Sequence, residues 1–128
     1  MFSHIMVGSN DLELSKKFYD ALFIAAGGTA GRCDSKGRIT YVKDGRLFMV
    51  TKPIDGQAAS FANGGTIGFS IPSSDVVDAW HAIGIANGGT SIENPPGIRD
   101  HEGTKIYLAY LRDPDGNKLC AIAPANAQ

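Results

Sequence analysis

The sequence contains an internal repeat that constrains the fold more than any other feature. Gly27-Gly28-Thr29 recurs as Gly88-Gly89-Thr90 roughly 60 residues later, and Ile5-x-Val7 is matched at a similar offset by Ile67-x-Phe69. Each copy starts with alternating apolar residues, continues with a helical period and ends in short alternating runs. The sequence therefore predicts two tandem βαβββ units.

The boundary between the two units is set by an irregular segment. Residues 53–65 show no sustained period and are bounded by Pro and Gly, which is typical of a linker. We therefore predict a first unit over residues 1–52 and a second over residues 66–124. A unit of this size alone would bury only about 60% of its extended-chain surface, so the halves are expected to fold as one domain.

The clearest strand pair is predicted over residues 105–122. Apolar residues alternate on both sides of Asp113-Pro114-Asp115-Gly116-Asn117, whose residue types favour a tight turn. Because successive side chains of a strand point to opposite faces, Cys120 is predicted on one face of the sheet and Leu119 on the other.

One helix is predicted in each unit. In the first helix, Asn10 is the expected N-cap and Glu13 completes a capping box. The second helix is expected to begin at Ser73 or Ser74. The predicted buried stripes are Leu14, Phe18, Ala21, Leu22 and Ala25 in the first helix and Val76, Val77, Trp80 and Ile83 in the second.

If a helix covers one face of each sheet, the opposite face is left for a cavity. The side chains expected there are chemically mixed, which suits a binding cavity better than a dry core. They are His4, Met49, Thr66 and Cys120. The predicted fold is α+β, with curled mixed sheets around a cavity and helices on the outer face.

Composition excludes several classes of partner. The net charge is -1 and no basic run is present, so nucleic acid is not an expected partner. No apolar run is long enough to span a bilayer, and the N-terminus lacks the pattern of a signal peptide. We therefore expect no membrane association and a cytoplasmic location, where Cys33 and Cys120 would stay reduced.

With these features, the sequence resembles the vicinal oxygen chelate superfamily, which contains glyoxalases, bleomycin-resistance proteins and extradiol dioxygenases. The resemblance rests on the doubled unit and on three motifs. They are His4-Ile5-Met6, Asp11-Leu12-Glu13 continuing through Ser15 to Phe18-Tyr19, and the segment from Arg112 to Leu119. It implies two sheets that enclose a cavity, a small-molecule ligand and a homodimer.

The resemblance also implies a ligand set for a divalent metal. Enzymes of the superfamily typically use a His or Gln on the first strand, a carboxylate on the fourth, a His or similar residue on the fifth and a Glu on the eighth. The matching positions here are His4, Met49, Thr66 and Cys120. Hard divalent cations prefer carboxylate oxygen and imidazole nitrogen, so we predict no metal and no other cofactor. A soft Cu(I) or Zn²⁺ site is the alternative.

Two residues of this set are candidates for chemistry. His4 is either a general base in the cavity or a polar lining residue. Cys120 is either a packing residue or a thiol activated by His4, because the resemblance brings both strands to the centre of the cavity.

The segment from Pro95 to Gly103 is predicted to be an irregular loop beside the cavity. Within it, Arg99 could bind an anionic ligand through paired N–H donors, with His101 nearby. The alternative is a solvated loop without a binding role. Tyr107 and Tyr110 must point to opposite faces, so only one of them lines the cavity. We favour Tyr107. The choice stays open because the turn interrupts the alternation of side chains, so the sequence does not show which tyrosine shares a face with Cys120.

These observations lead to competing functions. The first is a glyoxalase-like protein that binds a small, polar or anionic molecule without a metal, with or without a lyase or isomerase activity that uses His4, Arg99, His101 and Tyr107. The alternative is a non-catalytic, drug-sequestering protein that resembles bleomycin-resistance proteins. A third is a glyoxalase that has lost its metal.

Overall fold

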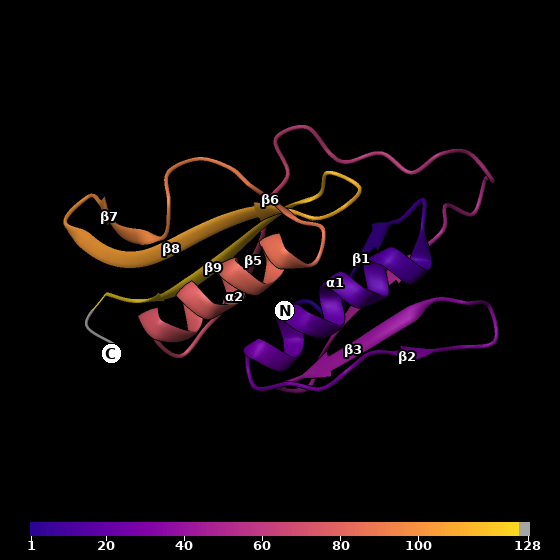
Figure 1. The fold of residues 1–128 in the computed structure, drawn as a ribbon, viewed down its shortest axis with the longest axis horizontal. Helices are drawn as coiled ribbons and strands as arrows, with labels where there is room; N and C mark the ends of the chain where they lie inside the picture. The colour runs from indigo at the N-terminus through magenta and orange to yellow at the C-terminus, as the bar shows by residue number, and fades with distance from the viewer. Residues whose placement is uncertain (126–128) are drawn as a thin grey trace.

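The computed structural model describes residues 1–125 as two mixed sheets, each covered by one helix (Figure 1). The first half contains β1 (His4–Gly8), α1 (Leu12–Ala25), β2 (Arg32–Cys33), β3 (Ile39–Lys43) and β4 (Arg46–Thr51). The second half contains β5 (Ile67–Ser70), α2 (Ser74–Ala86), β6 (Thr90–Ser91), β7 (Gly97–His101), β8 (Thr104–Arg112) and β9 (Lys118–Pro124). The predicted α+β fold is confirmed, and the two sheets do not close into a barrel.

The two halves share one sheet topology. In the first sheet the strand order is β1-β4-β3-β2, and β1 runs parallel to β4. In the second the order is β5-β9-β8-β6, with β7 also paired to β8, and β5 runs parallel to β9. The opening strand of each half therefore lies at a sheet edge beside the last strand of that half, as expected of a repeated unit.

The helix N-caps differ in part from the prediction. Asp11, not Asn10, caps α1, because its side chain accepts a hydrogen bond of 3.1 Å from the backbone N–H of Leu14. Asn10 instead exchanges two hydrogen bonds with Ala59 of the linker, so its amide is already used. In α2 the cap is Ser73, which accepts from the N–H of Val76 as predicted.

The buried faces of the helices also shift slightly from the predicted stripes. In α1, Phe18 and Leu22 are buried as expected, but Leu14 is 39% exposed and the buried face includes Tyr19 and Phe23. In α2, Val77 and Trp80 are buried while Ile83 is 37% exposed. Tyr19 and Phe23 are buried because their rings pack against Tyr41 and Phe48 of the first sheet, while α1 and α2 lie side by side (Figure 1).

The core is continuous between the two halves. Phe69 of β5 lies 5.5 Å from Phe48 and 5.8 Å from Phe23, measured between ring centroids, and both of those rings belong to the first half. Trp80 of α2 packs on the other side of Phe69 at 6.4 Å. Phe23, Phe48 and Trp80 belong to one cluster of buried residues, against which the partly buried Phe69 packs.

The turn between β8 and β9 joins the second half to the first. Asp113 accepts a hydrogen bond of 2.5 Å from the hydroxyl of Tyr19 in α1. Asp115 accepts from the backbone N–H of Asn10, and Asn117 donates to the carbonyl oxygen of Gly8. The predicted turn is therefore confirmed, and it also fastens the C-terminal hairpin to β1 and α1.

The linker packs on the same turn. Residues 52–66 contain no helix or strand. Within them, the ring of Phe61 lies 4.9 Å from the guanidinium carbon of Arg112 and covers Gly116. Gly116 has a φ of 93°, and a Cβ there would approach the Phe61 ring to 2.6 Å, so both the turn and the linker need glycine at this position.

The segment from Pro95 to Gly103 is not the irregular loop that we predicted. Residues Gly97–His101 form β7, which pairs antiparallel with β8. Glu102 and Gly103 make the connecting turn with φ values of 51° and 88°. The prediction was wrong because the segment has only one large apolar residue, Ile98, and its pairing depends on β8 rather than on its own pattern.

No helix within residues 1–125 is long and apolar enough to cross a membrane.

Candidate functional site

Each sheet has one face without a helix, which we call its helix-free face. In β1 and β4, Val7 and Val50 pack under α1, so their neighbours His4 and Met49 project to the helix-free face of the first sheet. In β9, Leu119 and Ala121 pack under α2, so Cys120 projects to the helix-free face of the second sheet. The candidate site is built on these two faces.

His4 and Met49 share the first helix-free face as predicted. The pairing of β1 with β4 sets His4 against Leu47 and Met6 against Met49. His4 is exposed, and its Nδ1 lies 2.8 Å from the hydroxyl oxygen of Ser3. Within one chain, the hydrogen-bond partner of the imidazole is therefore the adjacent Ser3 and not another candidate site residue.

Thr66 and Cys120 belong to the second half. Thr66 is exposed and immediately precedes β5, whose Gly68 is opposite Cys120 in β9. The four residues predicted to line the cavity are therefore divided in pairs between the two sheets. His4 and Cys120 lie on different sheets, and no hydrogen bond joins them among residues 1–125. The Cys120 thiol instead contacts the carbonyl oxygen of Ala121.

The environment of Cys120 does not activate its thiol. Cys120 is only 6% exposed, and this burial raises the pKa of the thiol. A hydrogen bond from Tyr110 and the positive charges of Lys118 and Arg99 act in the opposite direction but do not overcome the burial. The thiol therefore stays protonated at neutral pH, which disfavours a nucleophilic role.

Tyr110, not Tyr107, shares the face of Cys120. The β8–β9 pairing sets Tyr110 directly against Cys120. Tyr107 points to the other face, where its hydroxyl donates a hydrogen bond of 2.8 Å to Asp78 of α2. The preference for Tyr107 was wrong because the turn between the strands hid the register that fixes which tyrosine accompanies Cys120.

Lys118 is a charged member of this site that the sequence analysis missed. Its ammonium group forms an ion pair with Glu93 and lies 4.9 Å from the centroid of the Tyr110 ring. The spacing of two residues between Lys118 and Cys120 was a usable signal, because it places both on one face of β9. Glu93 gave no such signal, because it lies outside any strand. Only the folded chain brings its side chain next to Lys118 of β9.

Arg99 and His101 lie on β7, at the far edge of the same face. Arg99 is opposite Ile106, which alternates with Tyr110 along β8, so Arg99 shares the helix-free face. One of its terminal nitrogens donates hydrogen bonds of 3.1 Å and 3.0 Å to the carbonyls of Asn94 and Pro95. His101 is exposed at the end of β7 and paired with Thr104.

The donor set does not suit a hard divalent cation. His4, Met49, Thr66 and Cys120 supply one imidazole, a thioether, a hydroxyl and a protonated thiol, with no carboxylate. Within residues 1–125, no three His, Cys, Asp or Glu side chains gather in a way that could hold a metal ion. The residues at these positions therefore do not fit the metal typical of the enzymes that the sequence resembles.

The match to a family model decides the family. The model described as Glyoxalase/Bleomycin resistance protein/Dioxygenase superfamily matches residues 1–121. The chain belongs to this superfamily. The resemblance inferred from the sequence motifs is thereby confirmed.

Solved structures agree with this assignment to the glyoxalase superfamily. A glyoxalase/bleomycin resistance protein from Albidiferax ferrireducens T118 is 55% identical, with a TM-score of 0.92 over 96% of this chain and 98% of that chain. A glyoxalase-related enzyme from Fulvimarina pelagi is 19% identical, with a TM-score of 0.74 over 96% and 87% of the two chains. A lactoylglutathione lyase from Agrobacterium tumefaciens is 16% identical, with a TM-score of 0.67 over 96% and 92%. The last two show the fold alone, and no curated protein matches the chain.

Proposed function

We propose that this glyoxalase-superfamily protein binds a small, polar or anionic molecule against its helix-free faces without a resident metal. The observation that carries the proposal is the grouping of Arg99, Tyr110, Lys118 and Cys120 on one face. These residues supply hydrogen-bond donors and positive charge at the place where a superfamily enzyme would use a carboxylate to hold its metal.

Arg99 is the residue best suited to contact an anion. Lys118 is already neutralised by Glu93, whereas Arg99 forms no ion pair with any residue of the described chain. Only one terminal nitrogen of its guanidinium is used by the carbonyls of Asn94 and Pro95. The remaining N–H donors match the paired oxygens of a carboxylate or phosphate.

A second copy of the chain is proposed to complete the cavity. The first helix-free face exposes apolar side chains that a monomer would leave in water, namely Met6 at 41%, Leu47 at 37% and Val42 at 58%. A homodimer would set the first-sheet face of one copy over the second-sheet face of the other, and so unite the divided residues. Sedimentation velocity should report a dimer.

A lyase or isomerase activity is one form of this proposal. His4 or His101 would then exchange a proton with the bound molecule while Arg99 orients it. The alternative is sequestration of a drug without chemistry, which is favoured by the protonated Cys120 and the absence of carboxylates among the four superfamily positions.

A thermal-shift screen against small metabolites and antibiotics tests the proposal. A ligand at 100 times its dissociation constant adds about 2.7 kcal/mol to the free energy of unfolding. For an anionic hit, Arg99→Ala should abolish the shift, while the control Lys105→Ala, an exposed residue of β8 paired with Asp100, should keep it. A full shift in Arg99→Ala would remove Arg99 from the site. Incubation of each hit with protein, followed by NMR of the small molecule, separates turnover from binding.

A further inference from the structure

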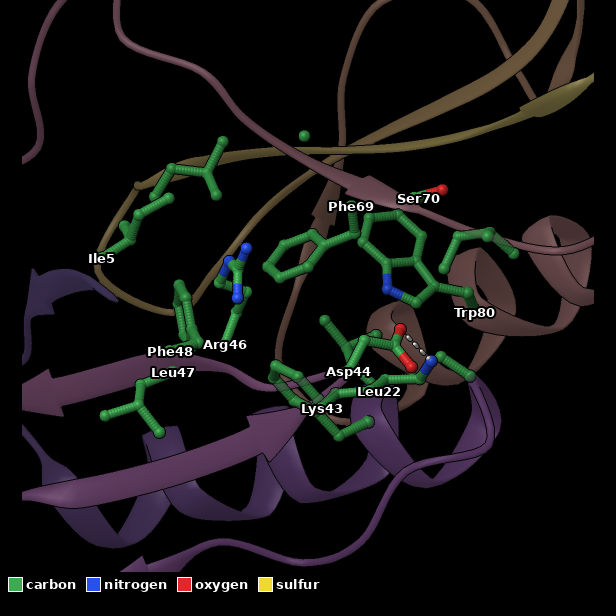
Figure 2. A pocket seen from close by; sticks show the side chains of 15 residues that line it. Ile5, Leu22, Lys43, Asp44, Arg46, Leu47, Phe48, Phe69, Ser70 and Trp80 are labelled. Atoms are coloured by element: carbon green, nitrogen blue, oxygen red, sulfur yellow. Dashed lines mark hydrogen bonds and ion pairs between the residues drawn. The ribbon is translucent and has the colours of Figure 1, made fainter. Parts of the chain in front are cut away.

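A separate pocket of about 270 Å³ opens between the two halves of the chain (Figure 2). It lies at the seam where β1 and β5, the edge strands of the two sheets, are not hydrogen-bonded to each other. Its lining comes from both helices and from β1, β4 and β5. Leu47 of the first helix-free face also lines this pocket, but none of the four residues that carry the site proposed above does so, and the two sites are therefore separate.

Aromatic rings form one side of this seam pocket. Phe69 packs between Phe48 and Trp80, with ring centroids 5.5 Å and 6.4 Å away. Phe48 is 5% and Trp80 is 2% exposed, so both rings are held in place by the core. Rigid aromatic walls of this kind favour a ligand that presents a flat ring of its own.

The buried indole of Trp80 carries a hydrogen-bond donor without an acceptor. Its Nε1–H donates to no residue in the part of the chain that the structure describes, and it is not sealed in the core, because no fully buried side-chain nitrogen or oxygen there lacks a partner. Figure 2 shows this edge of the indole turned toward the interior of the seam pocket. The N–H is therefore open to the pocket, where an oxygen atom of a ligand can accept its hydrogen bond.

Positive charge without a counter-ion stands at the rim of the seam pocket. Arg46, the first residue of β4, makes one long hydrogen bond of 3.4 Å to the carbonyl of Gly45 and pairs with no carboxylate among residues 1–125. The adjacent Lys43 is neutralised by Asp44 at 3.0 Å. Figure 2 shows the guanidinium of Arg46 directed toward Phe69.

We propose that the seam pocket binds a small aromatic acid. The ring of the acid packs against Phe48 and Phe69, its carboxylate pairs with Arg46, and an oxygen at its other end accepts the hydrogen bond of Trp80. The volume lies just below the roughly 300–1,000 Å³ of pockets for drug-sized molecules, so the ligand is a single-ring compound.

The single tryptophan of the sequence makes the test direct, because all tryptophan fluorescence comes from Trp80. The probes are 3-(4-hydroxyphenyl)propionate and the corresponding neutral amide, titrated into the full-length protein. We expect a saturable fluorescence change with the acid. The amide should bind at least about tenfold more weakly, because hydrogen bonds to charged groups contribute more than neutral ones.

Matched variants assign the binding to the seam pocket. Arg46→Met keeps the apolar stem and should weaken binding of the acid by about tenfold or more. The control Arg38→Met removes an arginine that pairs with Asp34 away from the pocket, and it should leave the dissociation constant unchanged. Trp80→Phe keeps a ring but loses the N–H, and calorimetry should show weaker binding of the acid in a variant that still unfolds cooperatively.

Three results would overturn the proposal: quenching that rises linearly without saturation, equal affinity for acid and amide, or unchanged affinity in Arg46→Met. The same titration in Arg99→Ala separates the two sites. The dissociation constant of the aromatic acid should be unchanged in this variant. The proposal for the seam pocket and the proposal for the helix-free face can therefore be contradicted independently of each other.

Discussion

The hydroxyl of Tyr19 in α1 donates a hydrogen bond of 2.5 Å to Asp113, which lies 94 residues further along the chain. Both groups are buried, with Tyr19 at 0% and Asp113 at 4% exposure. Burial raises the pKa of both side chains, and at Asp113 the hydrogen bonds from Tyr19 and Asn117 oppose that effect. This contact is therefore a buried polar link between the two halves.

Removing the hydroxyl in Tyr19→Phe should lower the free energy of unfolding by about 1.5–3 kcal/mol, because a buried carboxylate then loses a hydrogen-bond donor. Urea unfolding followed by circular dichroism measures the change. The control Tyr107→Phe removes a hydroxyl that bonds to Asp78 near the surface, and should change stability by no more than about 0.5 kcal/mol. Equal losses in the two variants would contradict a special role for the Tyr19 link.

His81 should make stability depend on pH. Burial lowers the pKa of His81 below its ordinary value of 6.5, although the charge of Asp78 acts in the opposite direction. The unfolded chain therefore takes up a proton at a higher pH than the folded protein does. The stability that neutral His81 contributes is complete above about pH 6.5 and is lost as the pH falls through the lowered value.

Urea midpoints measured about one pH unit above and one below 6.5 test this expectation. In His81→Gln the difference between the two urea midpoints should be smaller than in the unmodified protein, because the contribution of His81 is removed. An unchanged difference would show that another group causes the loss of stability in acid.

Gly84 allows α2 to approach both β8 and α1 closely. A Cβ at this position would lie 2.4 Å from a methyl group of Leu111 and 3.1 Å from one of Leu22, both of which are buried. Gly84→Val should therefore destabilise the protein by about 1–3 kcal/mol through overpacking. Ile85→Val places the same residue type at the next position, which is 46% exposed, and should cost less than about 1 kcal/mol. Thermal unfolding that ranks the two variants the other way would refute the close packing.

The two cysteines should differ in reactivity. Cys33 is exposed on β2, whereas burial covers the Cys120 thiol and raises its pKa. Iodoacetamide at neutral pH should therefore alkylate Cys33 and spare Cys120 until urea is added, as peptide mass mapping would show. Cys33→Ser should then take up no label in the folded state. Fast labelling of Cys120 in that variant would revive a nucleophilic role for this thiol.

Most of the fold follows from local signals in the sequence. Alternation around Asp113-Pro114-Asp115-Gly116-Asn117 predicted the β8–β9 hairpin and the opposite facing of Leu119 and Cys120. β7 was missed because its partner, not its own composition, makes it a strand. The cap at Asp11 was misplaced by one residue because Asn10 is recruited by the linker, a contact that depends on the folded chain.

The candidate site was less accessible from the sequence. Alternation placed His4 and Met49 together correctly, because β1 and β4 pair within one half. The unit boundary also placed Thr66 and Cys120 in the second half, but the sequence could not show how the two helix-free faces lie relative to each other, since that depends on how the halves pack. Periodicity marked Phe48, Phe69 and Trp80 only as apolar, and the seam pocket between them results from two sheet edges that stay apart.

The turn that fastens the C-terminal hairpin to β1 and α1 also bears on how the protein is made. Tyr19 is synthesised 94 residues before its partner Asp113, and Gly8 is synthesised 109 residues before its partner Asn117. The N-terminal half must therefore wait for these partners, and a chain that terminates prematurely before the turn would expose its first helix to proteolysis. These contacts are accordingly expected to form only after the C-terminal hairpin has left the ribosome.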